Sequence, residues 1–251
     1  MPTPFTHLVA AQRVLTDPQV ADADRALLQA HSDAFLLGSV VADGHFLCGL
    51  KREETHFYSY DRDITLTPWR VMMAQYPTLW SARNDEQRAF LAGYVFHLSI
   101  DETWTVDMMI PQFALGDWGT RAQRFLMMHL MLIEMDERDH AAIDALSVRA
   151  MHDAAPHNWL PFMDDASLRA WGDLMHRQIE PGGRSETLDI LAPRVNMTVE
   201  QVRVMLDSPE LLECELWRNV PRDVLADVEA RMVAHARAQM IAYLRESSVR
   251  I

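Results

Sequence analysis

A histidine and an aspartate four residues apart, His97 and Asp101, stand within an apolar stretch of the chain. At that spacing on a helix, the imidazole and the carboxylate lie one turn apart on the same face. A buried carboxylate is costly unless it is paired or binds a metal. Imidazole and carboxylate are common ligands of zinc and similar divalent ions. Taken alone, the pair is explained at least as well by a His–Asp hydrogen bond on a half-exposed helix.

Three more polar residues stand at the ends of apolar segments in the first hundred residues. His7 precedes an apolar stretch, Asp43 ends the apolar run 34–42, and His56 stands in the polar segment that follows. Each has a structural explanation: a satisfied core histidine, a capped helix end and an exposed loop residue, respectively. Their joint occurrence with the His–Asp pair favours a shared metal site.

The order of these residues resembles the zinc-dependent phospholipase C family. The motifs that carry the resemblance lie in the first 105 residues and are Phe5-Thr-His7-Leu, Leu37-Gly-Ser-Val-Val-Ala-Asp43, Thr55-His-Phe57 and Gly93-Tyr-Val-Phe-His97-Leu-Ser-Ile-Asp101. The resemblance implies an all-α bundle, shared with the related zinc-cluster single-strand nucleases, and hydrolysis of a phosphodiester or phosphomonoester bond.

A set of metal ligands follows from the resemblance. It implies that one zinc ion is held by Asp43, His56, His97 and Asp101. Asp101 would bridge to a second zinc ion, which His7 would also bind. Two ions that share a water lower its pKa and supply a metal-bound hydroxide for attack on phosphorus. Asp43 and Asp101 are the predicted catalytic residues, with Asp43 also orienting the nucleophile. Iron and manganese are alternatives to zinc.

The chain departs from the family at the amino terminus and after Asp101. The secreted enzymes use the amino group of the mature N-terminus as a ligand, whereas here no cleavable leader is expected and removal of Met1 would expose Pro2. The family has a histidine a few residues beyond the His-x-x-x-Asp motif, where this chain has Asp107. A full trinuclear zinc centre is therefore not expected.

The next long helix offers a sixth predicted metal ligand, His129. The family places a glutamate one turn further on, where this chain has Ile133. His129 shares a helix face with Asp136 and His140, at steps of seven and four. These three residues form either a substitute second metal site or an exposed, charged helix end.

The segment 43–68 contains basic residues between two predicted ligands. His45, Lys51 and Arg52 would contact an anionic substrate group if they faced the site. A solvated loop explains them as readily. The segment is expected to be irregular, and long connections of this kind are usually functional.

Apolar periodicity predicts helices almost throughout and no run of period-two strands. The expected helices are 5–15, 22–42 (two helices, broken near 31–33 and capped by Ser32 or Asp33), 68–75, one from Asn84 or Asp85 through Asp101, one from 121 to beyond 134, 165–178, 185–195, 198–206, 209–217 and 222–246. Residues 1–155 are the predicted metal-binding core. Residues 156–251 are a predicted C-terminal helical extension, packed on the core as one domain.

Composition narrows the partners and the compartment. The formal net charge of -13 argues against binding to a nucleic-acid backbone. Two distant cysteines, Cys48 and Cys214, cannot build a disulfide framework. No transmembrane segment and no secretion signal are expected, so the sequence predicts a cytoplasmic protein. A homo-oligomer is one option for its assembly.

The sequence thus predicts a metal-dependent phosphoester hydrolase that acts on a small-molecule or lipid substrate. The alternative is a non-catalytic helical binding or scaffold domain that keeps a structural metal site. The missing histidine beyond Asp101 favours this alternative.

Overall fold

The computed structural model describes residues 1–143 and 150–248, and all regular elements in these ranges are helices. In chain order they are α1 (Pro4–Val14), α2 (Asp22–Ala30), α3 (Ser32–Gly38), η1 (Val41–Cys48), α4 (Arg52–His56), α5 (Pro68–Gln75), η2 (Pro77–Trp80), α6 (Asp85–Trp104), η3 (Thr105–Ala114), α7 (Arg121–Ala142), η4 (Ala150–Asp153), α9 (Asp165–Ile179), α10 (Thr187–Leu191), η5 (Ala192–Val195), α11 (Val199–Leu206), α12 (Pro209–Leu211), η6 (Leu212–Trp217) and α13 (Arg222–Ser248). The expected all-α fold is confirmed.

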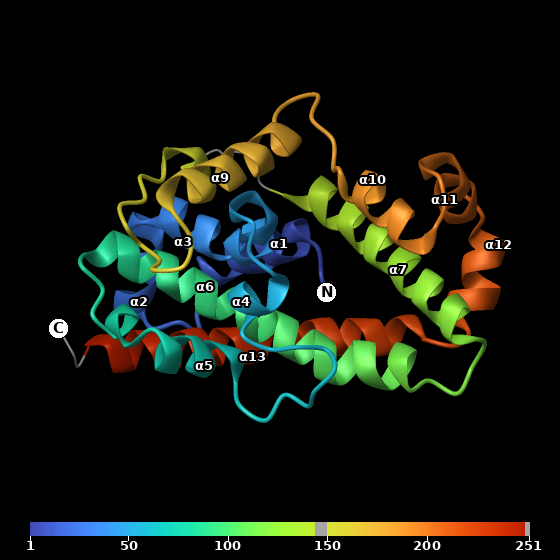
Figure 1. Ribbon diagram of the computed structural model, residues 1–251, viewed down its shortest axis with the longest axis horizontal. Helices are drawn as coiled ribbons and strands as arrows, with labels where there is room; N and C mark the ends of the chain where they lie inside the picture. The colour runs from blue at the N-terminus through green and yellow to red at the C-terminus, as the bar shows by residue number, and fades with distance from the viewer. Residues whose placement is uncertain (144–149, 249–251) are drawn as a thin grey trace.

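Helix α6 forms the centre of the molecule. Its N-cap is Asn84, whose side chain accepts a hydrogen bond from the backbone N–H of Gln87, and every residue from Ala89 to Asp101 is buried. The long helix α13 runs beside α6 along the lower edge of Figure 1, and α3 and α5 also pack on α6. A helix buried on every side fixes its polar side chains inside the core, and His97 and Asp101 are two of them.

Two glycines let α3 and α6 cross at close range. A Cβ atom on Gly38 would lie 2.0 Å from the carbonyl oxygen of Phe90, and one on Gly93 would lie 2.1 Å from that of Phe35. Only glycine allows this approach, because any larger residue would force the backbones apart. The crossing brings the end of α3 against the turn of α6 that carries His97.

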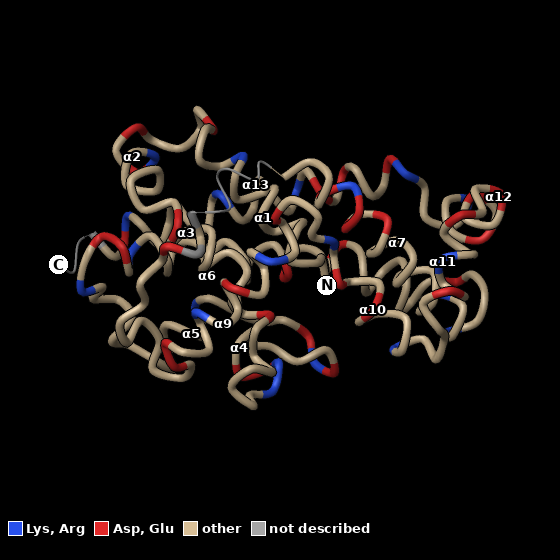
Figure 2. Tube along the Cα trace, turned by 90° about the horizontal axis from the view of Figure 1, so that it is seen from above, with Lys and Arg blue, Asp and Glu red and all other residues tan. Residues whose placement is uncertain are grey.

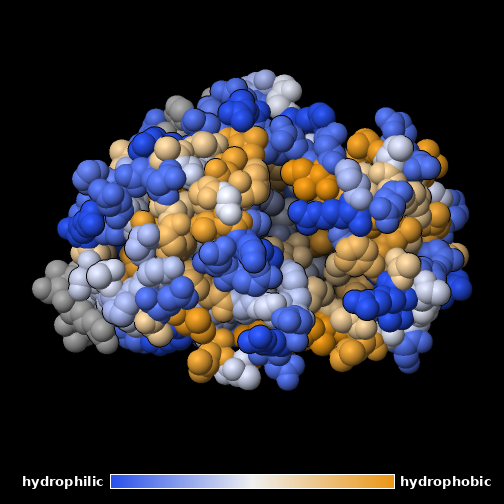
Figure 3. Space-filling model, in the orientation of Figure 1, coloured by the Kyte–Doolittle hydropathy of each residue, from blue (hydrophilic) through white to orange (hydrophobic). Residues whose placement is uncertain are grey.

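Helix α7 stands apart from the α3–α6 layer and packs on α1 at one side and on α10 and α11 at the other. The face in Figure 3 is hollowed near its centre, between the part that contains α1, α4 and α6 and the part that contains α7 and α10. Residues before and after position 156 share one cluster of buried apolar side chains, which includes Phe35, Trp171 and Val228.

The segment 43–68 is more regular than the sequence predicts. Much of it was expected to be irregular, but the structure has η1 and α4 there, and α4 ends at His56. Both are short, and both pack on larger elements: η1 on α9 and α4 on η1. The expected cap of α3 is also wrong, because its N-cap is His31 and no side chain caps it.

The surface carries both signs of charge. Lys and Arg are interspersed with Asp and Glu on most elements in Figure 2, so the net negative charge does not gather on one side. Among the helices of residues 1–143 and 150–248, none is both long enough and apolar enough to cross a membrane.

Candidate metal centre

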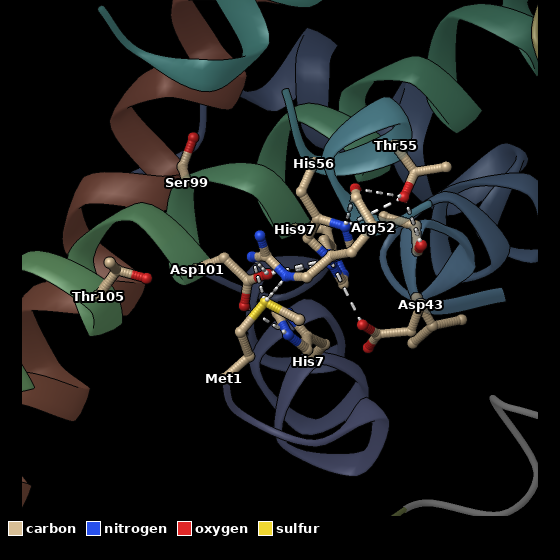
Figure 4. A network of polar contacts seen from close by, with 12 residues as sticks. Met1, His7, Asp43, Arg52, Thr55, His56, His97, Ser99, Asp101 and Thr105 are labelled. Carbon is tan, nitrogen blue, oxygen red and sulfur yellow. Dashed lines mark hydrogen bonds and ion pairs between the residues drawn. The ribbon is translucent and has the colours of Figure 1, made fainter. Parts of the chain in front are cut away.

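Five predicted ligands converge from four elements. His7 comes from α1, Asp43 from η1, His56 from the end of α4, and His97 and Asp101 from α6. The side chains of the three histidines and of Asp101 have no exposed surface, and that of Asp43 is 15% exposed. Figure 4 shows the five side chains pointing toward one another.

Three acceptor atoms form a nearly regular triangle at the centre of this cluster. The Oδ2 atom of Asp101 lies 3.3 Å from Nε2 of His56 and 3.5 Å from Nε2 of His97. The two imidazole Nε2 atoms lie 3.4 Å apart. Asp43 adds a fourth atom, Oδ1, at 3.4 Å from Nε2 of His56.

Backbone carbonyls fix the orientation of two imidazoles. Nδ1 of His97 donates to the carbonyl of Ser39 at 2.9 Å, which the close crossing of α3 and α6 makes reachable. Nδ1 of His56 donates to the carbonyl of Arg52 at 3.1 Å. A carbonyl only accepts, so Nδ1 carries the proton and the Nε2 lone pair of a neutral ring faces the cluster. Such second contacts are typical of histidines that bind metals.

The donor set fits a divalent cation. Within the described residues, His7 and Asp101 make no hydrogen bond through either ring nitrogen or either carboxylate oxygen. Buried polar groups without partners are rare, and here lone pairs face one another. A charge-assisted hydrogen bond would be about 2.8 Å long, shorter than the contacts observed. Ligands of a tetrahedral zinc with bonds of about 2.05 Å lie about 3.3 Å apart, close to the observed triangle.

A second group extends the cluster toward α1. Nε2 of His7 lies 3.4 Å from Oδ1 of Asp101, the oxygen that does not belong to the triangle. The ring of His7 stacks on that of His97 with their centroids 4.0 Å apart. Within residues 1–143 and 150–248, two sets of three residues have ligand atoms within 4.8 Å of one another: His7, His97 and Asp101, and Asp43, His56 and His97. His97 belongs to both sets, and Asp101 faces His7 with Oδ1 and the imidazoles of His56 and His97 with Oδ2.

The charges of the cluster shift several pKa values. Burial would raise the pKa of Asp101, but its neighbouring imidazoles, first that of His97, lower it well below the usual range. The imidazoles of His56 and His97 likewise outweigh burial at Asp43 and lower its pKa to about 2. Burial and the adjacent His97 lower the pKa of His7. The carboxylates are thus ionised and His7 is neutral at pH 7, as metal ligands must be, whereas the charge of Asp101 outweighs burial at His97 and raises its pKa.

His129, the sixth predicted ligand, lies outside both groups of three. Its Nδ1 donates to the carbonyl of Phe125 at 2.7 Å, and burial lowers its pKa. Asp136 accepts hydrogen bonds from Ser185 and Thr187. Nε2 of His140 bonds the carbonyl of Gln178 at 2.7 Å. Asp136 is buried, so this end of α7 is not the exposed, charged end that the sequence allowed.

Two further residues lie near the cluster: Met1, whose amino group the departure from the family argued against as a ligand, and Tyr58, which had no signal in the sequence. The amino group of Met1 is placed where burial lowers its pKa to about 6, against the charges of Asp101 and Asp43. Tyr58 donates through its hydroxyl to the backbone carbonyl of Asp101 at 3.5 Å. Arg52, whose role the sequence left open, lies with its Nη2 atom 3.9 Å from Oδ2 of Asp101.

Comparison with known proteins gives one match. Residues 6–104 match the model of the family described as zinc dependent phospholipase C. The resemblance expected over the first 105 residues is confirmed, and the matched range contains all five clustered residues. Comparisons with curated proteins and with solved structures give no match. The family match and the buried cluster together support a metal-dependent hydrolase.

Proposed function

We propose that this chain, whose residues 6–104 match the zinc dependent phospholipase C family, is a zinc-dependent hydrolase of phosphoesters. The observation that carries the proposal is the triangle of acceptor atoms on His56, His97 and Asp101. A bound divalent cation would satisfy all three of these atoms at once. The sequence alternative of a simple His–Asp hydrogen bond does not explain the histidine of α4 at the same carboxylate oxygen.

Each residue of the cluster has a defined part in this proposal. His56, His97, Asp43 and Asp101 would hold one zinc ion, and His7 and the other oxygen of Asp101 would hold a second. Zinc, when bound, polarises the phosphoryl oxygens and lowers the pKa of a water. Asp43 is the ligand with exposed surface, so its carboxylate can also accept a hydrogen bond from an attacking water and orient it. The carbonyls of Ser39 and Arg52 hold the two imidazoles in place.

Metal content and hydrolysis, measured on the same samples, test the proposal. Zinc-loaded wild-type protein should hydrolyse 4-nitrophenyl phosphate or its bis(4-nitrophenyl) diester, lose activity with a chelator and regain it with zinc. His97→Ala should lose zinc, measured by elemental mass spectrometry, together with activity. The control is His176→Ala, because His176 lies on α9 and pairs with Glu180 at 3.0 Å, away from the cluster.

Two outcomes would contradict the proposal. If wild-type protein keeps zinc but hydrolyses neither ester, the scaffold domain with a structural metal becomes the better account. If the folded protein takes up no zinc, iron or manganese, the metal site itself is wrong. The cytoplasmic location and the homo-oligomer stay predictions.

A further inference from the structure

Arg52 brings a positive charge to the edge of the candidate metal centre. It begins α4, and His56 ends the same helix one turn later. Its side chain is 14% exposed, and its Nη2 atom lies 3.9 Å from Oδ2 of Asp101. In a chain with a net charge of -13, this guanidinium lies beside the atoms that would hold a metal.

Two tyrosines hold the guanidinium in place. Nη1 of Arg52 donates to the backbone carbonyl of Tyr58 at 3.3 Å, and Nη2 donates to the hydroxyl of the same residue at 2.6 Å. The guanidinium carbon lies 4.4 Å from the ring centroid of Tyr58 and 4.2 Å from that of Tyr60. These contacts fix the plane of the guanidinium.

The remaining edge of the guanidinium meets a weak acceptor. Nε of Arg52 lies 3.0 Å from Sδ of Met1, and Nη2 contacts the same sulfur atom, as Figure 4 shows. A thioether is an uncharged, weak acceptor. The pair of N–H groups on Nε and Nη2 is the edge with which arginine binds two oxygens of a carboxylate or a phosphate. The sulfur therefore occupies the position at which an oxyanion would bind more strongly.

We propose that Arg52 binds the phosphoryl group of the substrate through its Nε and Nη2 atoms, and that the phosphoryl oxygens displace the thioether of Met1. This inference rests on the proposed function and assigns its substrate specificity: a tetrahedral oxyanion, held between the metal ligands and the guanidinium. The separation of 3.9 Å from Oδ2 of Asp101 is longer than a hydrogen-bonded ion pair of about 2.8 Å, so this carboxylate does not occupy the Nε–Nη2 edge. Arg52 is then a substrate-binding residue.

Binding of inorganic phosphate tests this role without turnover. Isothermal titration calorimetry on zinc-loaded protein should show that Arg52→Gln binds phosphate about 10 to 100 times more weakly than wild type, because a charge-assisted contact is lost. Arg52→Lys keeps the charge but not the two-pronged edge, so it should fall between the two. The control is Lys51→Gln, which removes the exposed neighbouring charge and should leave the affinity unchanged. Zinc content should be equal in all four proteins.

A second arm uses a water-soluble, short-chain glycerophospholipid in place of phosphate. If Arg52 recognises the phosphoryl group itself, the substitutions weaken both ligands. Loss of affinity for the lipid alone would contradict the inference.

The inference and the proposed function can fail separately. If Arg52→Gln and Arg52→Lys both bind phosphate as tightly as wild type, with zinc and fold intact, the inference is overturned even if the protein hydrolyses phosphoesters. If phosphate binding depends on Arg52 but no ester is hydrolysed, the proposed function fails and the binding role stands. If Arg52→Gln does not fold, Arg52→Lys decides, because it keeps the long side chain between the tyrosines.

Discussion

Helices α6 and α7 both carry histidine and aspartate at helical spacing, and they differ in what surrounds those side chains. On α6, the oxygens of Asp101 face imidazole nitrogens of three helices and make no hydrogen bond within the described residues. On α7, Asp136 is also buried, but hydroxyl groups of Ser185 and Thr187 donate to both of its oxygens. Similar sequence patterns thus lead to a set of converging acceptors in one place and to a satisfied hydrogen-bond network in the other.

Spacing along one helix therefore does not by itself define a metal site. The cluster on α6 exists because α1 and α4 bring imidazoles to the carboxylate of Asp101, and η1 brings Asp43 to one of these imidazoles. Asp136 on α7 instead accepts hydrogen bonds from Ser185 and Thr187, which lie just before α10 and at its first residue.

Replacing the central carboxylate should have the largest effect. Asp101→Asn removes the charge and one acceptor from both groups of ligands. Zinc affinity and hydrolysis should each fall more than about 100-fold, because even the loss of a contact behind a ligand costs 10- to 100-fold. The matched change on α7, Asp136→Asn, should leave zinc content and activity unchanged. Equal loss of zinc in the two variants would remove the contrast between the helices.

Adding a side chain where α3 and α6 cross should weaken the same metal site indirectly. In Gly93→Ala, the new Cβ would meet the carbonyl of Phe35 and push Ser39 away from His97. Unfolding free energy should fall by about 3 kcal/mol, and zinc affinity by about tenfold. Chemical denaturation and zinc titration measure the two.

The control for this change is Gly172→Ala on α9. Its new Cβ would lie 3.5 Å from Cδ1 of Leu37, an ordinary contact. The variant should be at least as stable as wild type. If Gly93→Ala were equally well tolerated, the close crossing would not position His97.

The buried carboxyl on α7 should instead show itself in the pH dependence of stability. Burial raises the pKa of Asp136 in the folded state, although the hydroxyl of Ser185 opposes this. A raised pKa gives stability below the unfolded value of about 3.9, and this stability is lost as the pH rises through the folded value. Because asparagine does not titrate, Asp136→Asn does not lose this stability as the pH rises. Its melting temperature should therefore rise relative to wild type between pH 4 and pH 7, by about 2 to 4 °C; a constant difference would contradict the shift.

A contact behind the ligands should have the smallest effect. The hydroxyl of Tyr94 donates to the carbonyl of Thr55 at 2.9 Å, next to His56. Tyr94→Phe should lower the unfolding free energy by about 1 kcal/mol and weaken zinc binding by less than about tenfold. Tyr76→Phe loses only a contact with Gln75 near the surface and serves as the control. Equal results for the two variants would mean that the contact with Thr55 does not support the site.

Helix ends with a strong local signal were predictable from the sequence. The helices expected from Pro68 and from Asn84 or Asp85 begin there as α5 and α6, and the helix expected at 198–206 is α11, which Thr198 starts with a capping box. Proline geometry and side-chain caps act within one turn, so they can be read from a few residues. The short helices η1 and α4 were missed, because elements of five to eight residues depend on packing against distant parts of the chain.

The candidate site was predictable only in part. The spacing of His97 and Asp101 indicated one helix face, and the order of motifs added His7, Asp43 and His56. No local pattern shows that Ser39 or Arg52 offers a carbonyl to a ring nitrogen, since these contacts depend on tertiary structure. The sulfur of Met1 beside Arg52 also depends on how α1 and α4 lie relative to each other.

Diffraction from crystals of the zinc-loaded protein, recorded at the zinc absorption edge, would show where this protein binds zinc. An anomalous peak should lie among Nε2 of His56, Nε2 of His97 and Oδ2 of Asp101, with a second peak between His7 and the other oxygen of Asp101. A peak beside His129 on α7, with none at the triangle, would contradict the account. So would the absence of any peak at Asp101 in protein that contains zinc.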